Sequence, residues 1–242
     1  MGLLTEDKKI AVPGEVLAEG DEYIASYGTR KMDDKVLANR VGIVNLHDKT
    51  IKLIHINGKY FPKIGDTIIC QITEILISGW RVQTNSAYSA VLSLKEATNE
   101  FIPKGADLKA ILNTGDYIAC KVVNLVGQNL VDISLKGPGL RRLHNGRIIK
   151  VGSFKVPRII GKGGSMIQLI KQYTNCRLIV GQNGIVWIQG EAENELIASQ
   201  AIRKIEEESH TQGLTERIKE HFVSIYGELK SKENEEEIKE EQ

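Results

Sequence analysis

The sequence predicts a multidomain fold in three structured parts: an all-β N-terminal module, a five-stranded β-barrel and an α+β domain. Two features lead to this prediction. Residues 12–135 contain short apolar runs separated by Gly, Pro, Asn and Asp turn signals, which are typical of strands. Strong helical periodicity, with apolar residues three and four positions apart, begins only after residue 164. The expected parts are residues 1–64, 65–137, 138–208 and, as a helix with an acidic tail, 209–242.

The composition is that of a globular protein and excludes several other classes. Apolar residues make up 41% of the chain and charged residues 26%, and no run of 18 apolar residues is available for a transmembrane helix. The N-terminus has no signal-peptide pattern, and Glu6 stands where a myristoylation motif needs Ser or Thr. The three scattered cysteines form neither a disulfide nor a zinc framework. We therefore expect a cytoplasmic protein with no cofactor, no metal and no membrane partner.

The charges are distributed unevenly along the chain. The net charge is only +1, but residues 137–204 hold 11 Lys and Arg against 3 Asp and Glu. No acidic residue occurs in the 58 positions between Asp132 and Glu191. Residues 205–242, in contrast, hold 12 acidic and 5 basic residues. A sustained basic segment attracts a polyanion such as nucleic acid, although a solvated basic surface would have the same composition.

The N-terminal part, residues 1–64, contains strand and turn signals but no recognisable chemistry. Residues 41–46 and 51–56 are apolar-rich runs on either side of His47-Asp48-Lys49-Thr50, a pattern that indicates a hairpin. Residues 23–27 form another short strand candidate. We interpret this part as a small β module used for packing or docking.

Five strand candidates follow within about 70 residues. They occupy residues 68–77, 80–84, 88–94, 117–126 and 130–135. A long connection after the third strand fits the five-stranded OB barrel. In the fourth strand Ile118, Cys120 and Val122 share one face, which we expect to line the barrel, while Lys121 points the other way. Cys70 and Cys120 are then most simply small core residues.

After the linker Gly137-Pro138-Gly139, the order of elements is β-α-α-β-β-α. The expected elements are strand 147–156, a short helix from residue 157, helix 165–173, strands 176–180 and 185–189, and helix 193–208. Ser165 is expected to cap the second helix, and Leu196 to lie on the buried face of the third. From the residues alone, the segment Gly181-Gln182-Asn183-Gly184 is most simply a hairpin turn.

Residues 209–242 are expected to form a last amphipathic helix and an acidic tail. Leu214, Ile218, Phe222 and Ile225 recur at steps of three and four residues, so this helix could pack on the body of the protein or on a partner. From Ser231 onward, 6 of the last 12 residues are Glu, a composition that favours disorder.

The strongest local motif is the glycine-rich segment Gly161-Lys162-Gly163-Gly164 between two short helices. Because glycine has no Cβ, a nucleic-acid backbone can approach it closely. The following helix offers N–H groups and the positive end of its dipole, and Lys162 and Arg158 add positive charge. With the β-α-α-β-β-α order, this segment resembles the KH domain, whose Gly-x-x-Gly loop holds the RNA backbone. The resemblance implies that these five residues contact RNA. The alternative is a plain helix–helix turn.

The block from residue 65 to residue 136 resembles an S1-type OB domain. The resemblance rests on Gly65-Asp66, on Gly115-Asp116 before a strand, and on the closing Ser134-Leu135-Lys136. The second strand lacks the Phe-rich pattern that is usual in S1 domains. The resemblance therefore implies a single-strand-binding fold with fewer stacking residues than most S1 domains have.

OB folds bind single strands on the face of their second and third strands, through aromatic and basic side chains. On that face the resemblance implies RNA contacts for Arg81 and Tyr88, and Lys121 on the fourth strand is a further candidate. Trp80 belongs either to this face or to the core.

The complete order, a β module followed by one S1 and one KH domain, resembles the RNA-binding cap subunit of the archaeal exosome, of the ribosomal-RNA-processing-protein-four type. Further matching segments are Val12-Pro13-Gly14-Glu15-Val16-Leu17, Gly79-Trp80-Arg81-Val82, Gly137-Pro138-Gly139 and Gly181-Gln182-Asn183-Gly184. In that family the Gly-x-Asn-Gly motif helps to pack the KH domain on the S1 domain. The resemblance implies a non-catalytic subunit that captures single-stranded RNA and feeds its 3′ end into a hexameric ring of RNase-PH-like subunits. It also implies three copies per cap, or a mixture with a related cap protein.

Two other functions share some of these features. A transcription factor of the NusA kind also places S1 before KH, but it needs two tandem KH domains, and one Gly-x-x-Gly helix pair is present. A ribonuclease needs a cluster of carboxylates or histidines, whereas the basic segment has no acids and the five histidines are scattered. A P-loop is excluded because Val156 stands where its first glycine is required.

Overall fold

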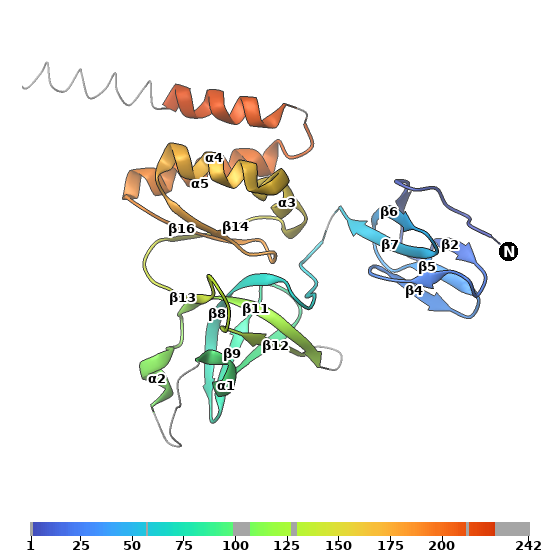
Figure 1. Cartoon of the computed structure of the whole chain (residues 1–242), viewed down its shortest axis with the longest axis horizontal. Coiled ribbons are helices and arrows are strands. Elements are labelled where there is room, and N and C mark those ends of the chain that lie inside the picture. The colour runs from blue at the N-terminus through green and yellow to red at the C-terminus, as the bar shows by residue number, and fades with distance from the viewer. Residues whose placement is uncertain (1, 57, 99–106, 127–129, 212, 226–242) are drawn as a thin grey trace, which may run out of the picture. The chain divides into compact units, whose positions relative to one another are not determined.

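The computed structural model describes residues 2–56, 58–98, 107–126, 130–211 and 213–225 (Figure 1). The chain divides into two compact units, Met1–Gly58 and Lys59–Gln242. None of the helices in the described residues combines the length and the apolar character needed to cross a membrane.

The first unit is an all-β module, as the sequence predicts. Its strands are β1 (Ile10–Ala11), β2 (Val16–Glu19), β3 (Ile24–Ala25), β4 (Thr29–Met32), β5 (Lys35–Ala38), β6 (Gly42–His47) and β7 (Thr50–His55). They form two sheets with the orders β1-β6-β7-β3 and β2-β5-β4. The expected hairpin is β6–β7, with His47 opposite Thr50. The β4–β5 hairpin was not predicted, because Thr29–Met32 has little apolar character to signal a strand and lies largely exposed.

The second unit begins with a closed barrel. Its elements are β8 (Thr67–Leu76), β9 (Gly79–Gln83), β10 (Ser89–Ser93), α1 (Leu94–Ala97), α2 (Leu108–Ile111), β11 (Tyr117–Val126), β12 (Leu130–Ser134) and β13 (Arg141–Leu143). The strand order is β12-β10-β9-β8-β11-β13, and the β12–β11 pairing closes the barrel. Cys70, Ile118, Cys120 and Val122 are fully buried in its core, and Lys121 is exposed, as predicted. The expected turn at 127–129 lies outside the described residues.

The KH part has the predicted α+β order. Its elements are β14 (Arg147–Lys150), the 3₁₀ turn η1 (Ser153–Lys155), α3 (Val156–Ile160), η2 (Lys162–Gly164), α4 (Ser165–Thr174), β15 (Arg177–Val180), β16 (Ile185–Gln189) and α5 (Ala192–Glu207). The sheet order is β14-β16-β15. The first strand ends at Lys150, earlier than expected, because η1 and α3 take up the residues before Gly161.

Two local expectations in this part were wrong. Ser165 does not cap α4; the N-cap is Gly164, in a left-handed conformation (φ 83°), and no side chain bonds to the helix end. Leu196 is 47% exposed rather than buried, because the face of α5 that meets the core is carried by Ile197, Ala201 and Ile205.

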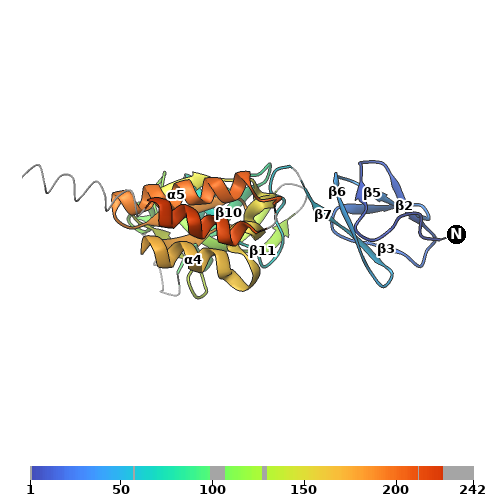
Figure 2. The same ribbon diagram turned by 90° about the horizontal axis from the view of Figure 1, so that it is seen from above.

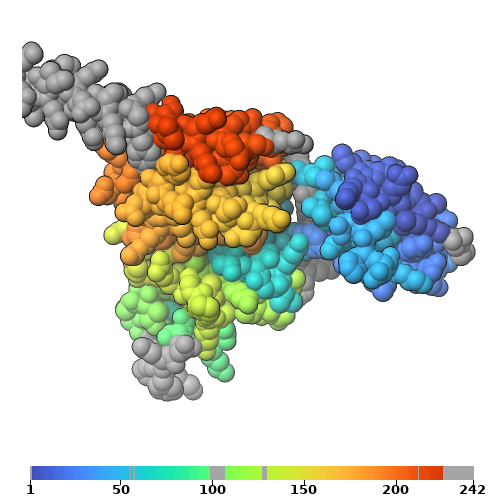
Figure 3. All heavy atoms as spheres, turned by 45° about the horizontal axis from the view of Figure 1, so that its top comes forward, coloured from blue at the N-terminus to red at the C-terminus, as the bar shows by residue number. Residues whose placement is uncertain are grey.

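The helices cover one face of the KH sheet, and Figure 2 shows α4, α5 and the last helix, residues 214–225, side by side. Leu214, Ile218 and Phe222 are buried in the same core as α4 and α5. The ring of Phe222 stacks on Tyr173 of α4 with 4.9 Å between centroids. The last helix therefore packs on the KH body, where the space-filling view shows it lying over the neighbouring helices (Figure 3).

Candidate nucleic-acid interface

The KH sheet is buried on both faces and lies between the helices and the barrel (Figure 1). Along β16, Val186 and Ile188 face the helical core, while Ile185 and Trp187 pack with residues of the barrel. The barrel contributes Ile69 and Ala119 to this second cluster. The barrel and the α+β domain are thus held together by a shared apolar cluster.

The turn at 181–184 also docks on the barrel. Asn183 is fully buried, and its side-chain amide bonds to the main chain of Ile69 and Thr84. The backbone N–H of Gln182 donates to the Thr67 carbonyl at 2.9 Å. Gly184 has φ 78°, and a Cβ there would lie 2.2 Å from the carbonyl oxygen of Val151. The segment is both a hairpin turn and the packing element that the family resemblance implies.

The tip of the Gly-x-x-Gly loop is open to solvent. Lys162 and Gly163 are exposed, and the space around a Cβ at Gly163 is open. Gly163 and Gly164 both have positive φ, 61° and 83°. Gly161 differs, because a Cβ there would lie 2.7 Å from the backbone nitrogen of Met166. Gly161 is therefore needed for the turn itself, while Lys162 and Gly163 form a tip that a ligand can reach.

The cations around this loop differ in their partners. Lys155 Nζ donates to the backbone carbonyl of Glu206 at 2.8 Å, and Arg203 pairs with the Glu206 carboxylate at 2.9 Å. Arg158 and Lys162 are exposed and form no ion pair with any residue that the structure describes. α4 begins directly after the loop, so the positive end of its helix dipole lies at the same place. The loop thus presents uncompensated positive charge to solvent.

The barrel candidates lie at separate places. Arg81 is exposed on β9 and pairs with Glu74 on β8 at 2.6 Å. Tyr88 is half-buried, with its ring edge-on to Phe61 at a centroid distance of 5.1 Å. Lys121 lies opposite Thr67 of β8, and Arg81 lies opposite Glu74 of the same strand. Thr67 and Glu74 are seven residues apart, which is about 23 Å at the usual rise of a strand. The structure does not bring Arg81 and Lys121 into one cluster with each other.

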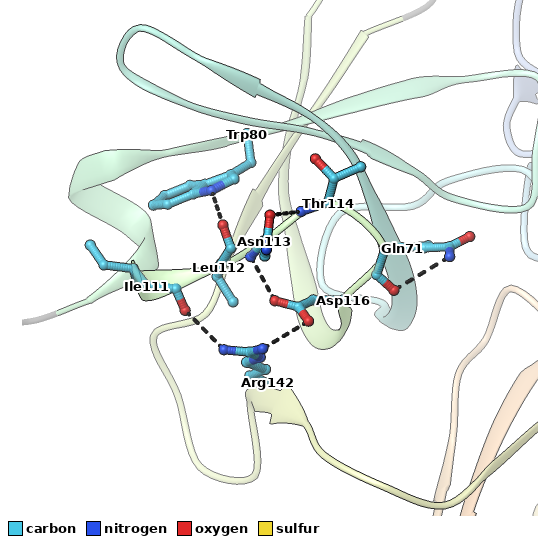
Figure 4. Close-up of polar contacts among 9 residues, drawn as sticks. Gln71, Trp80, Ile111, Leu112, Asn113, Thr114, Asp116 and Arg142 are labelled. Atoms are coloured by element: carbon cyan, nitrogen blue, oxygen red, sulfur yellow. Dashed lines mark hydrogen bonds and ion pairs between the residues drawn. The ribbon is translucent and has the colours of Figure 1, made fainter. Parts of the chain in front are cut away.

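Trp80 belongs to the barrel core, the second of the two alternatives. Its side chain is fully buried, and its indole N–H donates to the Leu112 carbonyl at 2.9 Å (Figure 4). Next to it, Arg142 of β13 pairs with Asp116 at 2.8 Å, which ties β13 to the barrel (Figure 4). No base can therefore stack on Trp80 without unfolding the barrel.

Three further basic side chains are exposed beside the KH–barrel junction: Arg141, Lys171 and Arg177. All three lie in the segment between Asp132 and Glu191 that has no acidic residue, but no sequence motif distinguishes them from other surface cations. Among the described residues, no group of three His, Cys, Asp or Glu side chains could hold a metal ion.

An OB barrel of the S1 type joined through a buried interface to a KH domain defines a class of RNA-binding protein. A family model for the KH domain matches residues 147–207, and one for the S1 domain of RRP4 matches residues 59–124.

Curated relatives extend this similarity over most of the chain. The exosome complex component Rrp4 of Methanobrevibacter smithii is 40% identical over 228 residues, 94% of this chain and 75% of the relative. The Rrp4 of Pyrococcus furiosus is 40% identical over 234 residues, 95% of this chain and 88% of the relative. A crystal structure of a candidate exosome complex RNA-binding protein, 36% identical, superposes with a TM-score of 0.63 and covers 69% of this chain and 97% of that one. The chain belongs to the Rrp4 family of exosome complex components.

Proposed function

We propose that the protein is the RNA-binding cap subunit of an exosome, which captures single-stranded RNA and delivers its 3′ end to a 3′–5′ exoribonuclease ring. The observation that carries the proposal is the exposed tip of the Gly-x-x-Gly loop. Among the described residues, no atom lies within 4 Å of a Cβ placed on Gly163, and Lys162 forms no ion pair. Family membership favours this function over the NusA-like alternative.

The proposed RNA contacts are the five residues Arg158, Gly161, Lys162, Gly163 and Gly164, with Arg81, Tyr88 and Lys121 on the barrel. On the barrel, Lys121 is the stronger candidate, because Arg81 must first give up its ion pair with Glu74. Tyr88 is half-buried and already packs on Phe61, so only part of its side chain is open to RNA.

The subunit is proposed to act without cutting RNA itself and to work in the cytoplasm, without a cofactor. The proposed ring consists of six RNase-PH-like subunits, with three copies of this chain in the cap or a mixture with a related cap protein. We also propose the division into an N-terminal docking module (1–64), an S1 domain (65–137), a KH domain (138–208) and a C-terminal helix and tail (209–242).

The assignment is tested by affinity purification of the full chain from native extract, followed by mass determination. Recovery of RNase-PH-like subunits in fixed proportion supports the proposal, and recovery of RNA polymerase instead would support the NusA-like function. Labelled RNA incubated with the pure chain, with Mg²⁺ or Mn²⁺ and with or without phosphate, is expected to stay full length. Shortening that follows the purified protein through a further column would contradict a non-catalytic role.

A further inference from the structure

A second basic site lies at the junction between the KH domain and the barrel, apart from the Gly-x-x-Gly loop. An open groove of about 500 Å³ is lined by Arg141 of β13, Lys171 of α4, Arg177 of β15 and Trp187 of β16, among others. A neighbouring hollow of about 210 Å³ shares Arg141, Arg177 and Trp187. No Asp or Glu occurs among the described residues that line either hollow.

Arg141 is held in place by an aromatic ring. Its guanidinium lies 5.7 Å from the centroid of the Trp187 ring, a cation–π distance. The ring itself is fixed, because Trp187 is buried and its indole N–H donates to the Asn145 carbonyl at 2.8 Å. A guanidinium supported in this way loses less side-chain entropy when it binds an anion.

The charges in the groove are not neutralised by the protein. The adjacent Arg142 is paired with Asp116 at 2.8 Å, so its charge is compensated within the protein. Arg141, Lys171 and Arg177 are exposed, and none of them pairs with an acidic group among the described residues. Three uncompensated cations on one open groove favour an anionic ligand.

The ligand that fits this groove is a sugar–phosphate backbone. Trp187 is 3% exposed and covered by Arg141, so the ring is not open to a base. Lys171 lies six residues after Ser165, about 9 Å along the axis of α4, so the groove is at the opposite end of α4 from the Gly-x-x-Gly loop. A strand held at the loop can continue along α4 to reach it.

We propose that Arg141, Lys171 and Arg177 form a second phosphate-binding site, which holds the backbone of single-stranded RNA beyond the nucleotides bound at the Gly-x-x-Gly loop. This proposal rests on the proposed RNA-binding function. It extends the path of the RNA strand from the Gly-x-x-Gly loop to the junction of the KH domain and the barrel. Its contacts are to phosphates, so it is independent of RNA sequence.

The test is RNA affinity of the full chain by fluorescence anisotropy, with one RNA of four nucleotides and one of sixteen. The variants are R141Q/R177Q and K171Q/R177Q, the second of which keeps the Arg141–Trp187 contact. R30Q/K219Q removes two exposed cations elsewhere and serves as the matched control. R141K/R177K keeps the charge.

We expect both groove variants to weaken binding of the longer RNA about tenfold and to reduce its log–log salt slope by about 1.4, at about 0.7 per lost phosphate contact. The four-nucleotide RNA fills only the loop and should bind all variants alike. R141K/R177K should recover most of the affinity, and the control should match the wild type.

Three outcomes overturn the proposal. The groove variants bind the longer RNA as the wild type does; they lose the same affinity for both RNAs; or the groove binds AMP or inorganic phosphate tightly while RNA affinity is unchanged, which indicates a small-anion site. If the wild type itself binds neither RNA, the proposed function fails as well, so the two failures are distinguishable.

Discussion

Asn183 of the KH domain and Ile69 of the barrel, 114 residues apart in sequence, are joined by two hydrogen bonds through one side-chain amide. Asn183 Nδ2 donates to the Ile69 carbonyl at 2.7 Å, and the Ile69 N–H donates to Asn183 Oδ1 at 3.2 Å. The β8–β9 ladder reaches only to Gln71 and Gln83. Beyond the end of this ladder, the Asn183 amide therefore bonds to the main chain of Ile69 as a paired strand residue would. It also donates to the Thr84 carbonyl at 2.8 Å.

Replacing Asn183 by Ala should destabilise the second unit by about 2–4 kcal/mol, because three main-chain groups at a buried interface lose their partner. Denaturant unfolding measures the loss, and calorimetry should show the barrel and the KH domain beginning to unfold separately. Gln182→Ala in the same turn is the control, since only the backbone of Gln182 is bonded to the barrel. Equal stability of the two variants would mean that the apolar cluster alone holds the domains together.

The sequence predicted most elements of the fold but not how the domains meet. Residues 185–188 of β16 are all buried, because one face of the strand meets the helices and the other meets the barrel. A strand buried on both faces shows no alternation, so its pattern does not identify a second packing surface. The packing role of Asn183 came from the family resemblance, since the residues alone indicated only a turn.

The candidate site was predictable where a local motif defines it. The Gly-x-x-Gly loop is contiguous in sequence, and its exposure follows from the helices on either side. The Arg81–Glu74 pair depends on the β8–β9 register, which shifts at a bulge between Ile72 and Glu74, and no local pattern specifies that shift. Arg141 and Arg177 meet only because the KH sheet packs on the barrel.

Trp80→Phe tests whether this residue is structural. The variant removes a buried indole whose N–H is bonded to Leu112, so we expect a loss of about 1–3 kcal/mol in the free energy of unfolding. RNA affinity of the folded variant should stay within about twofold of wild type, which corresponds to about 0.4 kcal/mol. A large loss of affinity in a fully folded variant would show that Trp80 contributes to RNA binding and not only to the barrel core.

Tyr60 gives the barrel a pH dependence at alkaline pH. Its ring is buried and its hydroxyl donates to Asp66 at 2.7 Å; burial first, and then this hydrogen bond, raise the pKa of Tyr60 far above the usual 10. The neutral form is favoured in the folded state, so the stabilisation is complete below pH 10 and is lost as the pH rises above it. Unfolding at pH 8 and pH 11 should show a smaller pH effect in Tyr60→Phe than in wild type. An identical pH effect in both would contradict the assignment.

RNA affinity should depend strongly on salt, because the cations proposed to bind RNA at the Gly-x-x-Gly loop, Arg158 and Lys162, form no ion pair with any described residue. Four phosphate contacts at the loop give a slope of about −3 in a plot of log K against log salt concentration. Titrations between about 50 and 300 mM salt, over which the Debye length falls from about 14 Å to about 6 Å, measure it. A slope near zero would exclude phosphate contacts as the main source of affinity.

The central claim is that the Gly-x-x-Gly tip binds RNA, and it is tested most directly by K162D/G163D. Gly163 lies in left-handed geometry (φ 61°, ψ 20°) with open space around it, which Asp tolerates, so the fold should survive. The matched control is G213D/K219D, which changes an exposed left-handed glycine and an exposed lysine at the last helix.

The decisive measurement is the RNA dissociation constant of K162D/G163D, taken together with its melting temperature. We predict a loss of about 1–3 kcal/mol in binding free energy, with melting within a few degrees of wild type and the control unchanged in affinity. An unchanged dissociation constant in the folded variant would contradict the claim and would assign RNA binding to the barrel face and the junction groove instead.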